Sequence, residues 1–184
     1  MRPDSTDSEI VTEILNGRKE GFTELVERYQ QAAYKMALVV LRHRADAEDA
    51  VSEAFVKAYA ALPRCRDGTN FKSWLLKIAY NCCHDILRKR AMTGKYTDPG
   101  PTEAAAHEPG PLDTVIEFED KQALWSALAQ IGPEDRSAVV MKYYHGLSYR
   151  DIAAALNWPL GTVASRLARS REKLRGILKG GDNQ

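Results

Sequence analysis

The 184-residue chain has no long apolar run, few cysteines and no glycine-rich loop of the kind that binds phosphate groups. No stretch approaches the roughly 18 apolar residues needed to cross a bilayer. The start, residues 1–9, is polar and partly acidic, unlike a secretory signal. Apolar residues make up 44% and charged residues 28%, which is typical of a folded soluble protein. We therefore expect no membrane insertion and a cytoplasmic location.

The residues that usually carry catalysis or metal binding are sparse. Cys65, Cys82 and Cys83 are an odd number without the paired spacing of a metal site. Cys82 and Cys83 are adjacent, so on a helix they point to different sides, and we favour inert, partly buried thiols over a redox or metal role. The four histidines are scattered, and no nucleophile has a neighbouring base motif. We expect no enzymatic activity, no cofactor and no metal.

The net charge is only +1, but it is unevenly distributed. Residues 57–90 hold eight basic and two acidic side chains, and residues 160–184 hold six and two. Between them, residues 91–120 hold one basic and seven acidic side chains. Two basic segments on separate domains fit a polyanion such as nucleic acid. Charge alone fits solvated helix faces equally well.

The spacing of apolar residues predicts helices in the first half. Intervals of three and four recur over residues 22–40, 47–62 and 71–90, with Pro63 ending the second stretch. Residues 91–113 are instead rich in proline, glycine, small and acidic residues, and cannot bury enough apolar surface to fold. A segment of this length inside a compact chain marks a domain boundary.

The second half is helical again. Helices are predicted over residues 115–129 and 134–144, separated by Gly132 and Pro133. After a turn at residues 145–147, Ser148 with Asp151 three residues on predicts a helix start. That short helix ends near Leu156, and a last one reaches about residue 178, which is the order of a helix-turn-helix. The predicted fold is all-α, with two small helical domains (1–90 and 114–184) joined by a flexible acidic linker (91–113).

The last helix separates an apolar from a polar face. Val163, Leu167, Leu174 and Leu178 are expected to point inward, and Ser165, Arg166, Arg169 and Lys173 outward. Arginine can bind guanine edges or phosphates with two hydrogen bonds, and lysine adds a point charge toward phosphates. A basic surface helix without a target is the alternative. Because the turn and the cap precede this helix, we favour DNA recognition.

The third helix of the first half has a polar stripe of its own. Its members are Lys77, Asn81, His84 and Arg88, and Asn70, Phe71 and Trp74 lie at the helix start. Aromatic rings beside cations and an amide suit unstacked single-stranded bases. The rings could equally belong to the core, and for Trp74 we favour the core. For the stripe as a whole, the residues alone favour neither binding of single-stranded bases nor a purely structural role.

Two motifs make the function more specific. The stretch Asp46-Ala-Glu-Asp-Ala-Val-Ser-Glu-Ala-Phe-Val-Lys-Ala-Tyr59, followed by Phe71-Lys-Ser-Trp-Leu-Leu-Lys-Ile-Ala-Tyr-Asn81, resembles region 2 of the extracytoplasmic-function sigma factors. The stretch from Leu147 through Pro159-Leu-Gly-Thr-Val-Ala-Ser-Arg-Leu-Ala-Arg-Ser-Arg171 is similar to their region 4. Order, linker and length agree, so the resemblance covers nearly all of residues 20–179.

The resemblance implies an alternative sigma factor, which binds core RNA polymerase and directs initiation at promoters, in a stress or envelope response. The implied partners are the β′ clamp helices and β flap of the polymerase, promoter DNA and an anti-sigma factor. Docking on the polymerase falls to Asp46, Asp49 and Glu53. The −10 element falls to Asn70, Phe71, Trp74, Lys77, Asn81 and Arg88. The −35 element falls to Ser165, Arg166, Arg169, Arg171 and Lys173.

Three positions depart from the family pattern. Ser52 stands where glutamine is common, His43-Arg44 replaces a turn that usually contains glycine, and Ala164 occupies a position that is often basic. The last departure concerns which −35 sequence is read. An ordinary helix-turn-helix repressor or activator is the alternative function, since residues 130–180 alone permit it. Such proteins usually dimerise, and the first half offers no sensor pocket or dimerisation helix.

Overall fold

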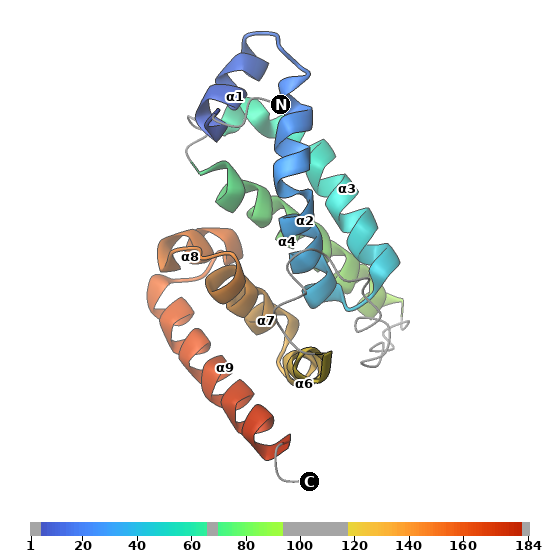
Figure 1. Cartoon of the computed structure of the whole chain (residues 1–184), viewed down its shortest axis with the longest axis vertical. Helices are drawn as coiled ribbons and strands as arrows, with labels where there is room; N and C mark the ends of the chain where they lie inside the picture. Colours follow the sequence, from blue (N-terminus) through green and yellow to red (C-terminus); the bar gives the residue numbers. More distant parts are fainter. Residues whose placement is uncertain (1–4, 66–69, 94–117, 182–184) are drawn as a thin grey trace.

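The structure, a computed structural model, describes residues 5–65, 70–93 and 118–181. These residues form helices and no strand, which confirms the predicted all-α fold (Figure 1). In chain order the helices are α1 (Asp7–Leu15), α2 (Gly21–Leu41), α3 (Arg44–Ala61), the 3₁₀ turn η1 (Leu62–Arg64), α4 (Phe71–Met92), α6 (Phe118–Ala129), α7 (Pro133–Val139), the π-helical turn η3 (Val140–Tyr144), α8 (Tyr149–Leu156) and α9 (Leu160–Gly181). We call α1–α4 the first helical region and α6–α9 the second.

Helix α1 was not anticipated from the apolar spacing, but its start has a clear local cause. The Thr6 hydroxyl accepts a hydrogen bond from the Glu9 backbone N–H, and the Glu9 carboxylate accepts one from the Thr6 N–H at 2.7 Å. This reciprocal pair satisfies two otherwise free donors of the first turn. The helix then buries Ile10, Val11 and Ile14 against the first helical region.

The turn between α2 and α3, which includes the departure at His43-Arg44, begins with an arginine in a strained conformation. Arg42 ends α2 in the left-handed region at φ 55°, a conformation that glycine adopts at lower cost. The next residue, His43, begins α3, and its Nδ1 accepts a hydrogen bond from the Asp46 N–H at 3.3 Å. The departure from the family pattern therefore still makes a tight turn.

The predicted boundaries of the next two helices need small corrections. Helix α3 ends at Ala61, as the break predicted at Pro63 requires, and Pro63 lies in the 3₁₀ turn η1 that follows it, since proline is tolerated in a first turn. Helix α4 continues past the predicted end at residue 90 to Met92. The first residues of the predicted linker are therefore helical, and residues 94–113 of it lie outside the described residues.

The helix-turn-helix is confirmed, with a local rearrangement before it. The helix predicted over 134–144 is α7 followed by the π-helical turn η3. Gly146 then turns the chain at φ 70°. The Ser148 hydroxyl and Asp151 carboxylate form the predicted capping box of α8. Asn157 ends α8 in the left-handed conformation, and α9 begins two residues past Trp158.

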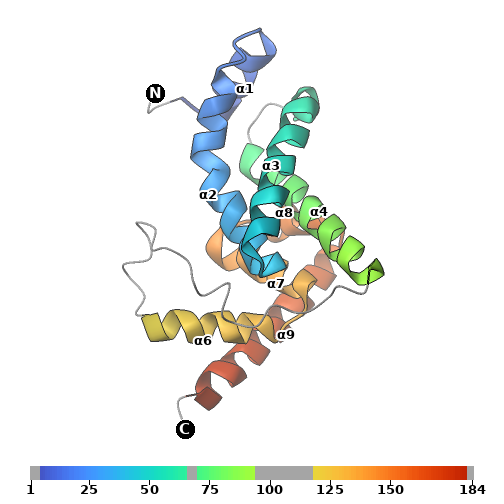
Figure 2. The ribbon, with the colours of Figure 1, turned by 90° about the vertical axis from the view of Figure 1, so that its right-hand side faces the viewer.

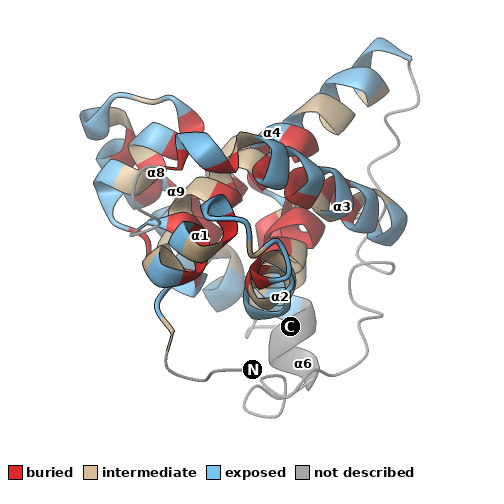
Figure 3. Cartoon of the chain, turned by 90° about the horizontal axis from the view of Figure 1, so that it is seen from above, coloured by how far each residue is buried: buried red, intermediate tan, exposed pale blue. Residues whose placement is uncertain are grey.

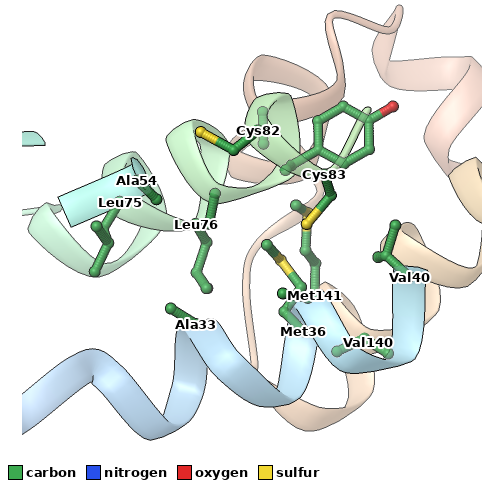
Figure 4. Packing of buried hydrophobic residues seen from close by; sticks show 14 of the residues in the cluster. Ala33, Met36, Val40, Ala54, Leu75, Leu76, Cys82, Cys83, Val140 and Met141 are labelled. Carbon is green, nitrogen blue, oxygen red and sulfur yellow. The ribbon is translucent and has the colours of Figure 1, made fainter. Parts of the chain in front are cut away.

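The two helical regions share one continuous core. Helix α4 packs against α8, and α2 packs against α7, so the second region lies directly on the first (Figures 1 and 2). Figure 3 shows buried positions running through both regions. At their junction Met36 and Cys83 of the first region converge on Met141 of the second (Figure 4). Association of the two regions is therefore part of the hydrophobic burial that stabilises this arrangement.

All three cysteines are free and buried. Cys82 and Cys83 point apart, as expected (Figure 4), and Cys82 faces α3, where the Lys57 Nζ lies 3.7 Å from its sulfur. Burial raises the pKa of both thiols. The reactive form of a cysteine is the thiolate, so burial makes these side chains poor nucleophiles.

Candidate functional site

Helix α9 presents its first turns to solvent. Val163 and Leu167 are buried against the helices that precede α9, which turns Ser165 and Arg169 outward, as predicted. The Ser165 hydroxyl donates to the Thr162 carbonyl oxygen at 3.1 Å, and the Arg169 Nε donates to the Ser165 carbonyl oxygen at 3.4 Å. Both side chains lie along the helix surface, and the guanidinium end of Arg169 remains available for a base edge or a phosphate.

Arg166 occupies a different place from Arg169. Its guanidinium is half-buried, 2.8 Å from the Glu134 carboxylate and 2.9 Å from the Asp135 carboxylate. It also stacks over the Trp158 ring, 4.2 Å from the ring centroid. These partners come from α7 and from the turn before α9, so Arg166 joins three parts of the helix-turn-helix. The expected outward position is wrong, because two carboxylates and an aromatic face compete successfully with solvent.

The remaining basic residues of α9 differ among themselves. Lys173 is exposed, as predicted, and its ammonium donates to the carbonyl oxygen of Gln130, just after α6, at 2.5 Å. Arg171 is exposed. Leu178, predicted to point inward, is 36% exposed, because the last turns of α9 extend away from the other helices (Figure 1). The stripe read from the sequence is thus divided between internal contacts and solvent.

The polar stripe of α4 is more uniformly accessible. Asn81, His84 and Arg88 are exposed and Lys77 is half-buried. Arg88 pairs with Asp85 one turn earlier at 3.1 Å, an ion pair that is too exposed to fix the guanidinium firmly. The amide of Asn81 therefore lies on an open, basic helix face, as the sequence predicted.

The start of α4 corrects one of the expected site residues. Phe71 is 0% exposed, and its ring lies 5.6 Å from the Tyr29 ring and 5.7 Å from the Trp74 ring. A ring enclosed in this way cannot stack on a base, so Phe71 belongs to the core, which apolar burial favours. Trp74 is half-buried and packs on the core, which is the alternative that the sequence favoured for it. Asn70 is exposed at the helix start.

Helix α3 carries the expected acidic face. Asp49 and Glu53 are exposed, and Glu53 pairs with Lys57 at 2.8 Å. Asp46 is half-buried and forms an ion pair with Arg90 at the end of α4. Asp46 therefore ties α3 to α4, whereas the other two carboxylates project outward.

An apolar group beside these carboxylates escaped sequence reasoning. Val56 is 70% exposed and Tyr59 is also exposed, one turn and two turns beyond Ser52. Their positions interrupt the inward periodicity of α3, which is the signal that could have identified them. Apolar side chains next to a small set of charges are typical of a protein-binding surface.

Comparisons with known proteins match the two helical regions to two regions of one family. Sigma-70 region 2 matches residues 25–93, and Sigma-70 region 4 matches residues 121–174. The ECF RNA polymerase sigma-E factor of Escherichia coli (strain K12) is 33% identical over 184 residues, which cover 95% of each chain. The RNA polymerase sigma-H factor of Pseudomonas aeruginosa is 29% identical and covers 97% of each.

Solved structures extend the similarity to the fold. The sigma factor RpoE in complex with the anti-sigma factor NepR from Bartonella quintana has a TM-score of 0.72 and 28% identity, covering 86% of this chain and 96% of that one. CnrH in complex with the cytosolic domain of CnrY has a TM-score of 0.70 at 22% identity, covering 96% and 99%. Within the described residues, no helix is both long and apolar enough to span a membrane.

Proposed function

The chain belongs to the extracytoplasmic-function (ECF) type of sigma-70 factors, and on that premise we propose that it directs core RNA polymerase to promoters by reading a −35 and a −10 element. Sigma factors direct transcription initiation and are not themselves enzymes. The observation that carries the proposal is the pairing of an exposed recognition helix, α9, with an exposed basic face on α4. A helix-turn-helix regulator needs only the first of these.

Recognition of the −35 element falls to the outward face of α9. Ser165 and Arg169 are the base-contacting candidates, because both are exposed in the first half of a recognition helix. Arg171 is exposed on a neighbouring side and suits a phosphate. Arg166 and Lys173 already have internal partners, so we assign them to holding α9 in place, with phosphate contact secondary.

Recognition and opening of the −10 element fall to α4. Asn81 supplies hydrogen-bonding groups for a displaced base, and Lys77 and Arg88 supply attraction to the backbone. Asn70 and Trp74 border the start of this face. A protein promotes strand separation when it binds the separated strand better than the duplex, and a basic face with one amide meets that requirement.

Docking on the polymerase falls to the outer face of α3. Asp49 and Glu53 provide the charge that would meet a basic surface on the β′ clamp helices, and Val56 and Tyr59 provide apolar area beside it. Asp46 contributes indirectly, because its ion pair with Arg90 fixes α3 against α4. Ser52 lies within this face, where its short side chain makes a smaller contact than glutamine would.

The family also suggests a cellular context. We infer regions 1–90 and 114–184 as the two functional domains, with 91–113 joining them, contact of the second domain with the β flap, and action in the cytoplasm, where the polymerase works. The similar structure from Bartonella quintana is a complex with an anti-sigma factor, which supports an anti-sigma partner here as well. A stress or envelope response is the matching physiological role.

Transcription with purified core polymerase tests the proposal. The full chain, core enzyme and a fragmented genome from the source organism should yield transcripts with a limited set of 5′ ends, and core enzyme alone should not. Shared sequences upstream of those ends would define the −10 and −35 elements. An ordinary helix-turn-helix regulator would bind DNA without enabling core enzyme to initiate, and that outcome would reject the proposal.

A further inference from the structure

Helix α9 contains a single acidic residue among its cations. This residue, Glu172, is exposed. None of the ion pairs among the described residues includes it, although Arg169 and Arg175 each lie three positions away, a spacing at which helical side chains can pair. Arg169 instead donates through its Nε to the Ser165 carbonyl oxygen at 3.4 Å, toward the start of the helix. The Glu172 carboxylate is therefore available to a ligand.

Glu172 lies on the side of α9 that carries the base-contacting candidates. It follows Ser165 by seven positions and Arg169 by three, so the three residues share one helix face within about 60°. The buried residues Val163 and Leu167 lie on the opposite side, and α9 runs along the outer edge of the second region (Figure 1). From Ser165 to Glu172 the helix rises by about 10 Å, which is the length of about three base pairs of duplex.

The direction of helical side chains brings the carboxylate closer to this face. A helical side chain leans toward the start of its helix and covers the preceding turn. Glu172 therefore covers the turn that contains Ala168 and Arg169. Ala168 is exposed and small, so the edge of a base can approach the carboxylate without meeting a long side chain.

An unpaired carboxylate on a face that contacts DNA restricts which bases can lie next to it. Phosphates repel it, and so do the acceptor atoms that guanine and thymine present in the major groove. The amino group of adenine lies between two acceptors, its own N7 and the O4 of the paired thymine. The amino group of cytosine has an acceptor on one side only, so cytosine is the base that a carboxylate binds with the least repulsion.

We propose that Glu172 is a specificity-determining residue of α9, which accepts a hydrogen bond from the N4 amino group of a cytosine in the −35 element, next to the base pair contacted by Arg169. This inference rests on the proposed function, because it assigns a base to the helix that reads the −35 element. The carboxylate also lowers the affinity for sequences without that cytosine. Glu172 therefore contributes to discrimination between sequences through repulsion as well as attraction.

Transcription from a promoter library tests the role of Glu172. Core polymerase is combined with the full chain and a promoter whose −35 element is randomised, and barcodes in the transcripts report the preference for each base at each position. Glu172→Ala removes the carboxylate, and Glu172→Gln replaces it with an amide, which can bind adenine through two hydrogen bonds. Alanine and glutamine are good helix formers at an exposed position, so both variants should fold. Glu27→Gln, at an exposed position of α2, is the matched control for the lost charge, and Arg169→Ala marks the neighbouring base pair.

The wild type and Glu27→Gln should prefer cytosine about 3- to 10-fold at a position next to the one where Arg169→Ala loses its preference. Glu172→Ala should lose the preference for cytosine, and Glu172→Gln should replace it with a preference for adenine. A wild type without this preference, unchanged preferences in both variants, or a uniform gain on all sequences overturns the base contact. If the wild type produces no transcript from any template, the proposed function is rejected. Selection of bound duplexes by the full chain alone then measures the same base preferences and decides the role of Glu172 separately.

Discussion

Helices α4 and α9 both carry a row of cations, but they use them differently. On α4 the polar side chains at Asn81, His84 and Arg88 are exposed and lie over a core made by other residues of that helix. On α9, Arg166 is half-buried and paired with carboxylates of α7, whereas Lys173 and Arg169 are exposed, Lys173 with a hydrogen bond to the Gln130 carbonyl oxygen. A basic stripe in a sequence therefore shows how many cations a helix carries, but it does not show which of them are accessible to a ligand.

The difference follows from the size of the two regions. The first helical region packs four helices and buries large residues such as Phe71 and Leu75. Among the residues whose burial is described, the second has fewer large buried residues, and its short helices α7 and α8 offer little area to hold α9. Ion pairs and a cation–aromatic contact add a directional attachment. In this small helical region, basic residues of the type that binds DNA thus stabilise the fold itself.

The largest expected effect concerns the acidic face of α3, which contrasts with both basic helices. Changing Asp49 and Glu53 together to lysine should lower the affinity for core polymerase by more than about 100-fold, since like charges brought together cost several kcal/mol. Co-purification and a binding titration at moderate salt measure this. The exposed pair Glu27 and Glu48, changed to lysine, alters net charge equally and should leave binding nearly intact. Wild-type affinity in the first variant would exclude α3 as the docking face.

The second prediction separates the two arginines of α9. Arg169→Ala should weaken binding to −35 duplex by about 1–3 kcal/mol and relax sequence preference, because an exposed base contact is lost. Thermal stability should hardly change. Footprinting on specific and scrambled duplexes provides the measurement, and equal affinity of variant and wild type for both would show that Arg169 reads nothing.

Arg166→Ala is the matched comparison. It should reduce affinity for all duplexes alike and lower the free energy of unfolding by about 1–2 kcal/mol, because it removes partly buried ion pairs and the stacking on Trp158. Glu134→Gln with Asp135→Asn should reproduce this behaviour. A direct phosphate contact would instead reduce the salt dependence of binding by about one ion, with stability unchanged.

A third effect arises at the junction of the regions. Burial, together with the charges of Lys72 on α4 and Lys35 on α2, lowers the pKa of His145 to about 4. An exposed histidine, as in the unfolded chain, titrates near 6.5. The contribution of His145 to stability is therefore constant above that pH and decreases as the pH falls from about 6.5 to 4. At pH 5.5 the loss should be about 1 kcal/mol relative to neutral pH. Urea unfolding at both pH values measures it. His145→Gln should lack this component, and equal pH slopes in both proteins would refute the assignment.

The smallest effect is expected on α4. Asn81→Ala should leave closed promoter binding intact and slow opening by about 3- to 10-fold, the equivalent of one hydrogen bond. Permanganate reactivity of unpaired thymines reports opening, and a gel shift reports closed binding. A template with a mismatched −10 segment should restore the rate while sequence preference there relaxes. If a fully paired promoter opened at the wild-type rate, Asn81 would have no role in melting.

Sequence reasoning succeeded where the cause is local. The apolar periodicity of α2 and α4, the capping box of Ser148 and Asp151, and the break at Gly132 all act over a few residues, so they could be predicted from neighbours alone. Helix α1 was missed although its capping box was equally visible. The exposed positions of Asn81, Ser165 and Arg169 also follow from helical geometry.

The sequence by itself thus determined the helices other than α1, the cap of α8, the helix-turn-helix and the membership in the sigma-70 family. Only the tertiary structure decided which charged side chains remain accessible. The partners of Arg166 lie about 30 positions away in the chain, and the two carbonyl oxygens of α2 to which the buried Arg136 donates lie 96 and 97 positions away. Periodicity predicts on which side of its own helix a side chain lies. Whether a carboxylate or a free carbonyl from another helix lies next to that side chain depends on how distant helices pack. That packing buried Phe71, engaged Arg166 and set the second helical region on the first.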